Sequence, residues 1–198
     1  KVIGIVSYNY SSGNIWKIEN CIKNFKHKYY VTNQLNDLKS CTHLILPGVG
    51  KFDTVINSLK KNNIINFLRN LPQEKKILGI CIGSQILFES SEEGKKIQGL
   101  SHFKGKIYSF KRKPILNIGK KEVLIKKKSV FKKFNKKKFY FLHGFYPKLG
   151  SFTNGVTIHE KNKFSSIVVN KNCVGVQFHP ELSGNQGLEF INTFLNKF

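Results

Sequence analysis

A short apolar run that ends in a cysteine constrains this chain more than any other stretch. Residues 77–80 (Ile-Leu-Gly-Ile) are typical of a strand buried in a parallel sheet, and an apolar, helix-compatible segment, 82–88, begins directly after Cys81. Gly79 and Gly83 flank the cysteine two residues away on each side. Small residues there permit a sharp strand-to-helix turn, which presents the sulfur at a helix N-terminus, where a thiolate is favoured. The pattern predicts a nucleophilic cysteine; the alternative is a buried cysteine between two glycines.

A histidine and a carboxylate near the C-terminus are the partners that such a cysteine needs. His179, Pro180 and Glu181 follow a strand predicted over residues 173–177. A thiol nucleophile requires a base to take its proton and a third group to orient that base. Residues i and i+2 of an extended segment point the same way, so His179 and Glu181 are expected to lie side by side. The two stretches together predict a Cys-His-Glu triad, and they outweigh the alternative of an incidental histidine at a strand end.

A Pro-Gly-Val-Gly sequence, residues 47–50, follows a strand predicted over residues 42–46. Glycine at a strand end can turn a backbone N–H towards a ligand. The backbone of Gly50 is therefore a candidate for one half of an oxyanion hole, and the N–H of Ile82, next to the cysteine, is a candidate for the other half. A plain Pro-Gly turn is the alternative, and the presence of the predicted triad outweighs it.

The first half of the chain alternates strands with helices, which predicts an α/β fold with a parallel sheet and helices on both of its faces. Ligands bind at the carboxyl ends of the strands in such sheets. The second half is rich in strands, and neither a linker nor a repeat divides the chain, so a single domain over residues 1–198 is expected. The predicted elements are strands 2–6, 29–32, 42–46, 77–80, 104–110, 122–126, 139–142, 156–159, 165–169 and 173–177, helices starting at 15, 52 (to 71), 82 and 188, and a loop over 183–187.

The net charge of +23 raises the question of a nucleic-acid partner. Of the 34 basic residues only Arg69 and Arg112 are arginine, whereas nucleic-acid surfaces depend on arginine for bidentate contacts. We therefore expect no nucleic-acid partner. The positive potential would still help to attract an anionic partner or substrate of another kind. No membrane span, metal-ligand pattern or cofactor motif is evident, and four cysteines without disulfide-like spacing are typical of a thiol enzyme in a reducing cytoplasm.

The segments 79–85 (Gly-Ile-Cys-Ile-Gly-Ser-Gln) and 177–181 (Gln-Phe-His-Pro-Glu) together resemble the triad-type, class I glutamine amidotransferases. The Leu-Pro-Gly-Val-Gly sequence, residues 46–50, is similar to the glutaminase subunits of imidazole glycerol phosphate synthase within that family. The resemblance covers nearly the whole chain. It implies a single-domain, flavodoxin-like α/β fold, in which helices flank a central, mostly parallel sheet.

The same resemblance implies that L-glutamine is hydrolysed to glutamate and ammonia. In the family the ammonia passes to a (β/α)8-barrel cyclase subunit, which makes imidazole glycerol phosphate and aminoimidazole carboxamide ribotide in histidine biosynthesis. The barrel is thus the implied partner, in a heterodimer. Glu93 matches the family acid that meets the substrate α-amino group, with a surface acid as the alternative. By resemblance the substrate-binding residues are Gly48, Gln85, Glu93, His143 and Gly144.

The chain departs from the family pattern at positions that concern the partner. Residues 116–121 read Leu-Asn-Ile-Gly-Lys-Lys in place of Pro-His-Met-Gly-Trp-Asn, so Lys120 replaces an interface aromatic, and Leu182 replaces a basic residue after the predicted triad. A paralogous glutaminase that supplies ammonia for amidino-sugar synthesis in surface polysaccharides is therefore an alternative. A non-catalytic basic binding protein on the same fold is a third, and the complete triad argues against it.

Overall fold

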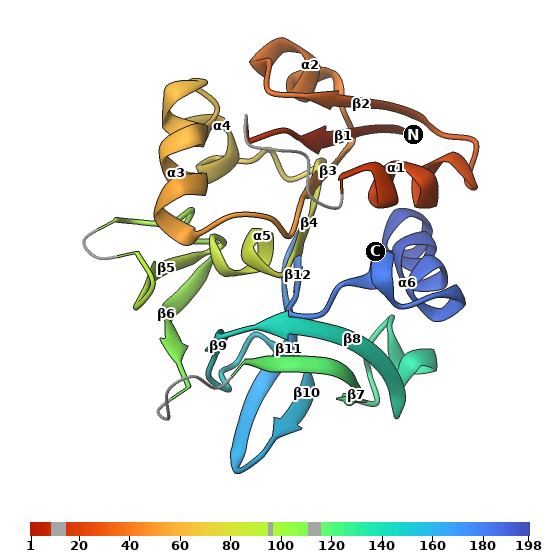
Figure 1. Ribbon diagram of the computed structural model, residues 1–198. Coiled ribbons are helices and arrows are strands. Elements are labelled where there is room, and N and C mark those ends of the chain that lie inside the picture. Colours follow the sequence, from red (N-terminus) through yellow and green to blue (C-terminus); the bar gives the residue numbers. More distant parts are fainter. Residues whose placement is uncertain (9–14, 95–96, 111–115) are drawn as a thin grey trace.

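Two neighbouring parallel strands lie at the centre of the molecule, β4 (Lys76–Ile80) and β12 (Cys173–Val176). The computed structural model describes residues 1–8, 15–94, 97–110 and 116–198. Every residue of β12, and all of β4 except Lys76, is buried, as predicted for strands covered on both faces. The two strands are almost a hundred residues apart in sequence, so the centre of the sheet joins the two halves of the chain (Figure 1).

The main sheet has nine strands in the order β2-β1-β3-β4-β12-β11-β10-β7-β8. Its first five strands are parallel and follow the order of flavodoxin-like sheets, whereas β11, β10, β7 and β8 are added by antiparallel pairing. The remaining bounds are β1 Val2–Val6, β2 Lys28–Thr32, β3 His43–Leu46, β7 Asn117–Ile125, β8 Lys137–His143, β10 Thr153–His159 and β11 Asn162–Asn170. A second sheet, in the order β5-β6-β9, consists of β5 Phe88–Ser91, β6 Phe103–Ser109 and β9 Phe145–Pro147.

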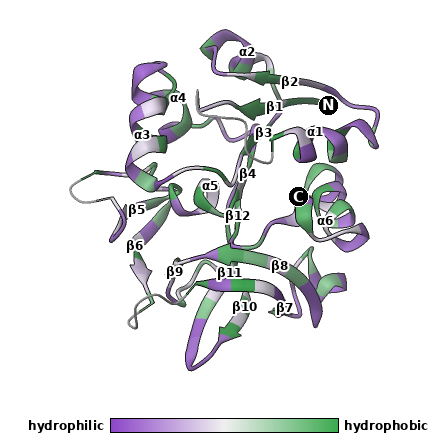
Figure 2. Ribbon diagram, viewed as in Figure 1, coloured by the Kyte–Doolittle hydropathy of each residue, from purple (hydrophilic) through white to green (hydrophobic). Residues whose placement is uncertain are grey.

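Helices cover both faces of the parallel strands, as Figure 1 shows. The helices α1 (Ile15–Lys23) and α6 (Asn185–Lys197) pack on one face with a phenylalanine-rich cluster, and α2 (Leu35–Ser40), α3 (Phe52–Lys61), α4 (Ile65–Arg69) and α5 (Ile82–Gln85) pack on the other. Two 3-10 helices, η1 (Lys132–Phe134) and η2 (Pro180–Leu182), complete the described elements. The central strands are hydrophobic (Figure 2). The predicted fold class is confirmed, and none of the described helices is long and apolar enough to cross a membrane.

Three predicted helix boundaries were wrong. The helix expected over residues 52–71 is divided, because Asn63 adopts a left-handed φ of 57° after α3 ends. The helix expected over 82–88 stops at Gln85, and Phe88 instead begins β5, where its ring packs 5.3 Å from Phe103 and 5.2 Å from Phe152. Part of the loop expected over 183–187 belongs to α6, which begins at Asn185. In the β5 case tertiary packing of an aromatic side chain overrides local helical preference.

Candidate functional site

Cys81 lies in the turn between β4 and α5, in a backbone conformation that residues other than glycine rarely adopt. Its φ is 49° and its ψ is −109°. The backbone N–H groups of Ser84 and Gln85 both donate to the Cys81 carbonyl at 3.0 Å, which closes the turn into the helix. A Cβ at Gly79 would lie 2.5 Å from the Gly83 carbonyl oxygen, so the turn requires the glycine there. Strain of this kind is characteristic of functional positions.

His179 and Glu181 follow β12 and lie side by side. The Nδ1 atom of His179 is 2.7 Å from Oε1 of Glu181, and the two side chains are 3% and 0% exposed. The adjacency agrees with the prediction, but its geometric reason was wrong. The chain leaves the extended conformation at Pro180 and enters η2, so a 3-10 turn brings the carboxylate to the ring. The backbone N–H of His179 donates to the Tyr140 carbonyl at 2.8 Å, which anchors the segment to β8.

Gly48 brings the two halves of the site together. A Cβ at this position would lie 2.7 Å from the Cε1 atom of His179 and 3.1 Å from the Cβ atom of Cys81. Only a glycine can approach both side chains so closely without displacing them. The segments that follow β3, β4 and β12 therefore meet at the carboxyl ends of three adjacent parallel strands, which is the edge where ligands bind in such sheets.

Burial and charge act in opposite directions on His179. Burial lowers its pKa, but the electrostatic interactions and hydrogen bonds with Cys81 and Glu181 raise it to about 10. The site therefore favours a protonated imidazole at His179. Glu93 differs, because burial raises the pKa of its carboxyl while a hydrogen bond from the backbone of Phe52 lowers it, with a net rise.

A cavity of about 220 Å³ opens beside the sulfur. It is lined by Gly50, Cys81, Ile82, Gln85, Glu93, Leu116, Leu142, His143, Gly144 and Phe145. Seven of the ten residues predicted for the site are in this lining, and the other three, Gly48, His179 and Glu181, lie beside Cys81 or beside one another. The structure thus brings the whole predicted set to one place, with Gly50 and Ile82 in the cavity lining beside Cys81.

Sequence patterns did not identify several polar groups around the sulfur. The Cys81 thiol donates to the Leu142 carbonyl at 3.6 Å, and Nε2 of Gln177 lies 3.8 Å from the same sulfur. Gln177 is 1% exposed. A glutamine that continues an apolar strand two residues before the predicted base is a signal that could have indicated Gln177. No local pattern indicates a backbone carbonyl such as that of Leu142.

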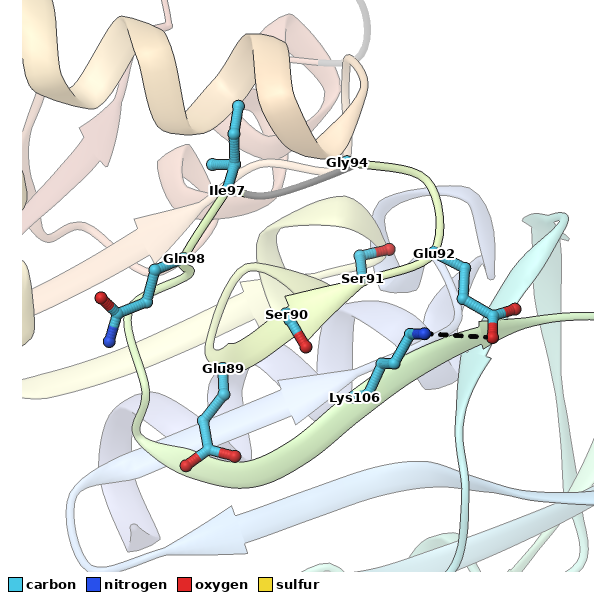
Figure 3. Close-up of a pocket in the computed structure, with 8 residues that line it drawn as sticks. All are labelled: Glu89, Ser90, Ser91, Glu92, Gly94, Ile97, Gln98 and Lys106. Carbon is cyan, nitrogen blue, oxygen red and sulfur yellow. Dashed lines mark ion pairs between the residues drawn. The ribbon is translucent and has the colours of Figure 1, made fainter.

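A wider hollow of about 710 Å³ lies apart from the cysteine, beside β5 and β6 (Figure 3). Its two carboxylates already have partners within the chain. Glu92 forms an ion pair of 3.3 Å with Lys106, and Glu89 accepts a hydrogen bond of 2.7 Å from the backbone of Gly105. None of the ten predicted site residues lines this hollow, so size alone does not mark the functional site here.

Comparison with solved structures supports the fold. A crystal structure of a glutamine amidotransferase superposes with a TM-score of 0.75 at 15% identity, covering 98% of this chain and 99% of that one. A glutamine amidotransferase from Thermotoga maritima superposes with a TM-score of 0.62 at 19% identity, covering 99% and 83%. At these identities the likeness concerns the fold alone.

Comparison with sequence families gives the class. Residues 6–198 match the family model described as glutamine amidotransferase class-I, and the chain belongs to that family. Within it the chain groups with the imidazole glycerol phosphate synthase subunits called HisH. It is 38% identical to that subunit of Leptospira borgpetersenii and 35% identical to that of Leptospira interrogans, over 98% of both chains in each pair. It is also 34% identical to subunit HisH 2 of Methanococcus maripaludis, over 98% of this chain and 99% of the relative.

Proposed function

We propose that this chain is the glutaminase subunit of an imidazole glycerol phosphate synthase and hydrolyses L-glutamine to glutamate and ammonia. The observation that carries the proposal is the meeting of Cys81, His179 and Glu181 beside one cavity at the carboxyl ends of β4 and β12. At about 220 Å³ the cavity is smaller than the roughly 300–1,000 Å³ of drug-sized ligand sites, which suits a substrate of amino-acid size.

The proposed chemistry follows from the groups at the site. The Cys81 sulfur attacks the side-chain amide carbon of glutamine, and the backbone N–H groups of Gly50 and Ile82 stabilise the resulting oxyanion. Because Nδ1 of His179 is bonded to Glu181, its Nε2 is the nitrogen that exchanges protons at the sulfur side. His179 protonates the departing ammonia and then activates the water that hydrolyses the glutamyl thioester, while Glu181 orients the ring.

Glu93 is the proposed partner of the substrate α-amino group. Its Oε2 accepts a hydrogen bond of 2.9 Å from the Phe52 N–H at the start of α3, which fixes the carboxylate in the cavity wall. The other oxygen is then available to a cationic group. Gln85, His143 and Gly144 form the opposite part of the lining and are proposed to fit the rest of the substrate.

The proposed partner is a (β/α)8-barrel cyclase that receives the ammonia, and the heterodimer is proposed to work in the cytoplasm. Three exposed apolar side chains lie at or near the cavity, on β8, on β7 and directly before β7: Leu142 is 44% exposed, Ile118 51% and Leu116 54%. Leu116 and Leu142 also line the cavity, and Ile118 pairs with Leu142 across the strands. A partner that covers this rim would keep ammonia from bulk water. Lys120 lies exposed on the same strand, where the family pattern has an aromatic residue.

The polysaccharide paralogue is not favoured, because relatives that match over nearly the full length carry the name of the histidine-pathway synthase. The decisive experiment measures glutamate release from L-glutamine with and without a cognate cyclase barrel and its ribonucleotide ligand. We expect strong stimulation when both are present. Basal activity without stimulation would leave a glutaminase with a different partner.

Cysteine variants test the chemistry in the same assay. Replacing Cys81→Ala is expected to abolish glutamate release, whereas Cys41→Ala, which removes a buried thiol outside the site, should retain it. Full turnover by Cys81→Ala, or failure of a glutamine-analogue electrophile to label Cys81 in the stimulated complex, would overturn the proposed mechanism and revive a non-catalytic role.

A further inference from the structure

A series of buried polar groups connects β7 to the neighbourhood of the nucleophile. The Nδ2 atom of Asn117 lies 2.8 Å from Nε2 of His143, and Nδ1 of His143 lies 2.8 Å from the Phe145 carbonyl. The same carbonyl accepts a hydrogen bond of 3.0 Å from Nε2 of Gln85. Asn117 is 0% exposed, His143 6% and Gln85 3%. These bonds are therefore shielded from water. A hydrogen bond is stronger in the protein interior than in water, because the interior has a lower dielectric constant.

Chemistry fixes the direction of every bond in this series. A backbone carbonyl can only accept, so Nδ1 of His143 carries the hydrogen and donates it to Phe145. Burial lowers the pKa of His143 to about 3, so the ring is neutral and its Nε2 is an acceptor. The donor to Nε2 is then the Asn117 amide N–H. Rotating this amide by half a turn would place its oxygen against a ring nitrogen that has no hydrogen.

The series continues to the sulfur. The Gln85 Nε2 atom that binds the Phe145 carbonyl also lies 3.2 Å from Oε1 of Gln177, and Nε2 of Gln177 lies 3.8 Å from the Cys81 sulfur. Gln85 thus uses both N–H groups within the protein, and its orientation depends on the Phe145 carbonyl. That carbonyl is in turn shared with the His143 ring.

Packing alone does not account for an asparagine at position 117. Its Oδ1 atom is buried and has no hydrogen-bond partner in the described part of the chain, which is unfavourable for a buried amide. An apolar side chain of similar size would fill the space without that cost. The amide N–H bond to His143 is the interaction that an apolar residue would lose.

We propose that Asn117 is a positioning residue of the candidate active site: its amide holds the His143 ring and, through the Phe145 carbonyl, holds Gln85 in the wall of the cavity beside Cys81. The inference rests on the proposed function, since it concerns the same cavity. Asn117 itself does not line the cavity and acts through His143.

The test compares Asn117→Leu and Asn117→Asp with the unchanged chain, and Asn172→Leu serves as the matched control. Asn172 is also buried, and its Nδ2 also donates, to the carbonyls of Pro72 and Lys75. It lies directly before the start of β12, whereas Cys81 is next to the end of that strand. The readouts are kcat and KM for glutamate release in the stimulated complex, the melting temperature, and the nitrogen chemical shifts of ¹⁵N-labelled histidine rings.

We expect the unchanged chain to show His143 as the Nδ1–H tautomer. Asn117→Asp should convert the ring to its doubly protonated form, because a carboxylate accepts where the amide donated. Both Asn117 variants should lose about tenfold or more in kcat/KM, while Asn172→Leu lowers the melting temperature alone. The inference is overturned if the ring signals of both Asn117 variants match the unchanged chain, or if their kcat/KM stays within about twofold of it. The ring signals need no turnover, so they remain decisive even if the unchanged chain released no glutamate.

Discussion

The Nδ1 atom of His179 lies 2.7 Å from the Oε1 atom of Glu181, and the two side chains are almost fully buried. The second carboxylate oxygen, Oε2, has no hydrogen-bond partner among the described residues. Among the described residues, the Glu181 carboxylate therefore forms its hydrogen bond with the His179 imidazole and does not belong to a wider hydrogen-bond network. Its charge is one of the reasons that the pKa of His179 is raised.

Replacing Glu181→Gln keeps the size of the side chain and removes its charge. A neutral amide stabilises the imidazolium less and can also present an N–H to Nδ1, which would favour the wrong tautomer. We expect kcat for glutamate release to fall roughly 10²-fold or more. The control is Glu74→Gln, an exposed acid, which should not change kcat. Equal activity of the two variants would show that Glu181 does not orient the base.

The raised pKa of His179 predicts a pH dependence of stability. The folded value of about 10 lies above the ordinary value of 6.5, so the native state holds an extra proton between them. This group thus stabilises the fold fully below about pH 6.5, and the contribution is lost as the pH rises through about 10. The melting temperature should fall more steeply between about pH 7 and about pH 9 in the unchanged chain than in His179→Gln.

The comparison with His179→Gln is needed because other groups act in the same direction. Burial raises the pKa of Cys21 to about 11 and that of Cys173 to about 12, so both thiols resist ionisation only while the chain is folded. Their effect is common to both proteins and cancels in the difference. Parallel pH curves for the two proteins would contradict the assignment of the extra proton to His179.

Replacing Gly48→Ala tests how tightly the site is packed. The added Cβ would lie 2.7 Å from His179 Cε1, which forces the ring or the loop to move. Because a displacement of about 1 Å can cost 10²-fold in rate, we expect a loss of about that size in kcat/KM. Val49→Ala in the same loop is the control, since it adds no atoms. Near-normal turnover by Gly48→Ala would mean that the base is not held at this distance.

The backbone of Cys81 predicts a conflict between stability and chemistry. A φ of 49° with a ψ of −109° is unfavourable for a residue with a Cβ, at a cost of about 1–3 kcal/mol, and glycine removes most of it. After the greater chain entropy of unfolded glycine is subtracted, Cys81→Gly should be about 1 kcal/mol more stable than Cys81→Ala. Urea unfolding of the two inactive variants measures the difference. An alanine variant of equal or greater stability would show that the turn is not strained.

Local sequence patterns predicted the elements that depend on neighbouring residues. The apolar run before Cys81, its flanking glycines and the segment after it define a turn within seven residues, and the structure contains that turn. The strand before the turn, β4, has the expected buried pattern. The catalytic and substrate-binding roles assigned to these residues stay predictions, which the experiments above address.

Features that depend on distant contacts were not predictable from local sequence patterns. The helix after Cys81 is short because Phe88 joins a second sheet, and Phe103 and Phe152, which pack against it there, lie outside the local segment. The bond from Asn117 to His143 joins two strands whose register no single segment specifies. The periodicity of hydrophobic residues indicates which face of a helix or strand is buried, but it does not indicate which other element packs against that face.

The position of β12 between β4 and β11 has a consequence for how the protein is made. A ribosome that has released only the first half of the chain has exposed the cysteine turn, but the edge of β4 that later pairs with β12 is still unpaired and His179 has not been synthesised. Cys81 therefore meets His179 only after β12 has been made and has entered the sheet. A chain that stops before β12 would carry Cys81 without His179 and Glu181 beside it, so the topology keeps the three residues of the predicted triad apart until both halves of the sheet have been made.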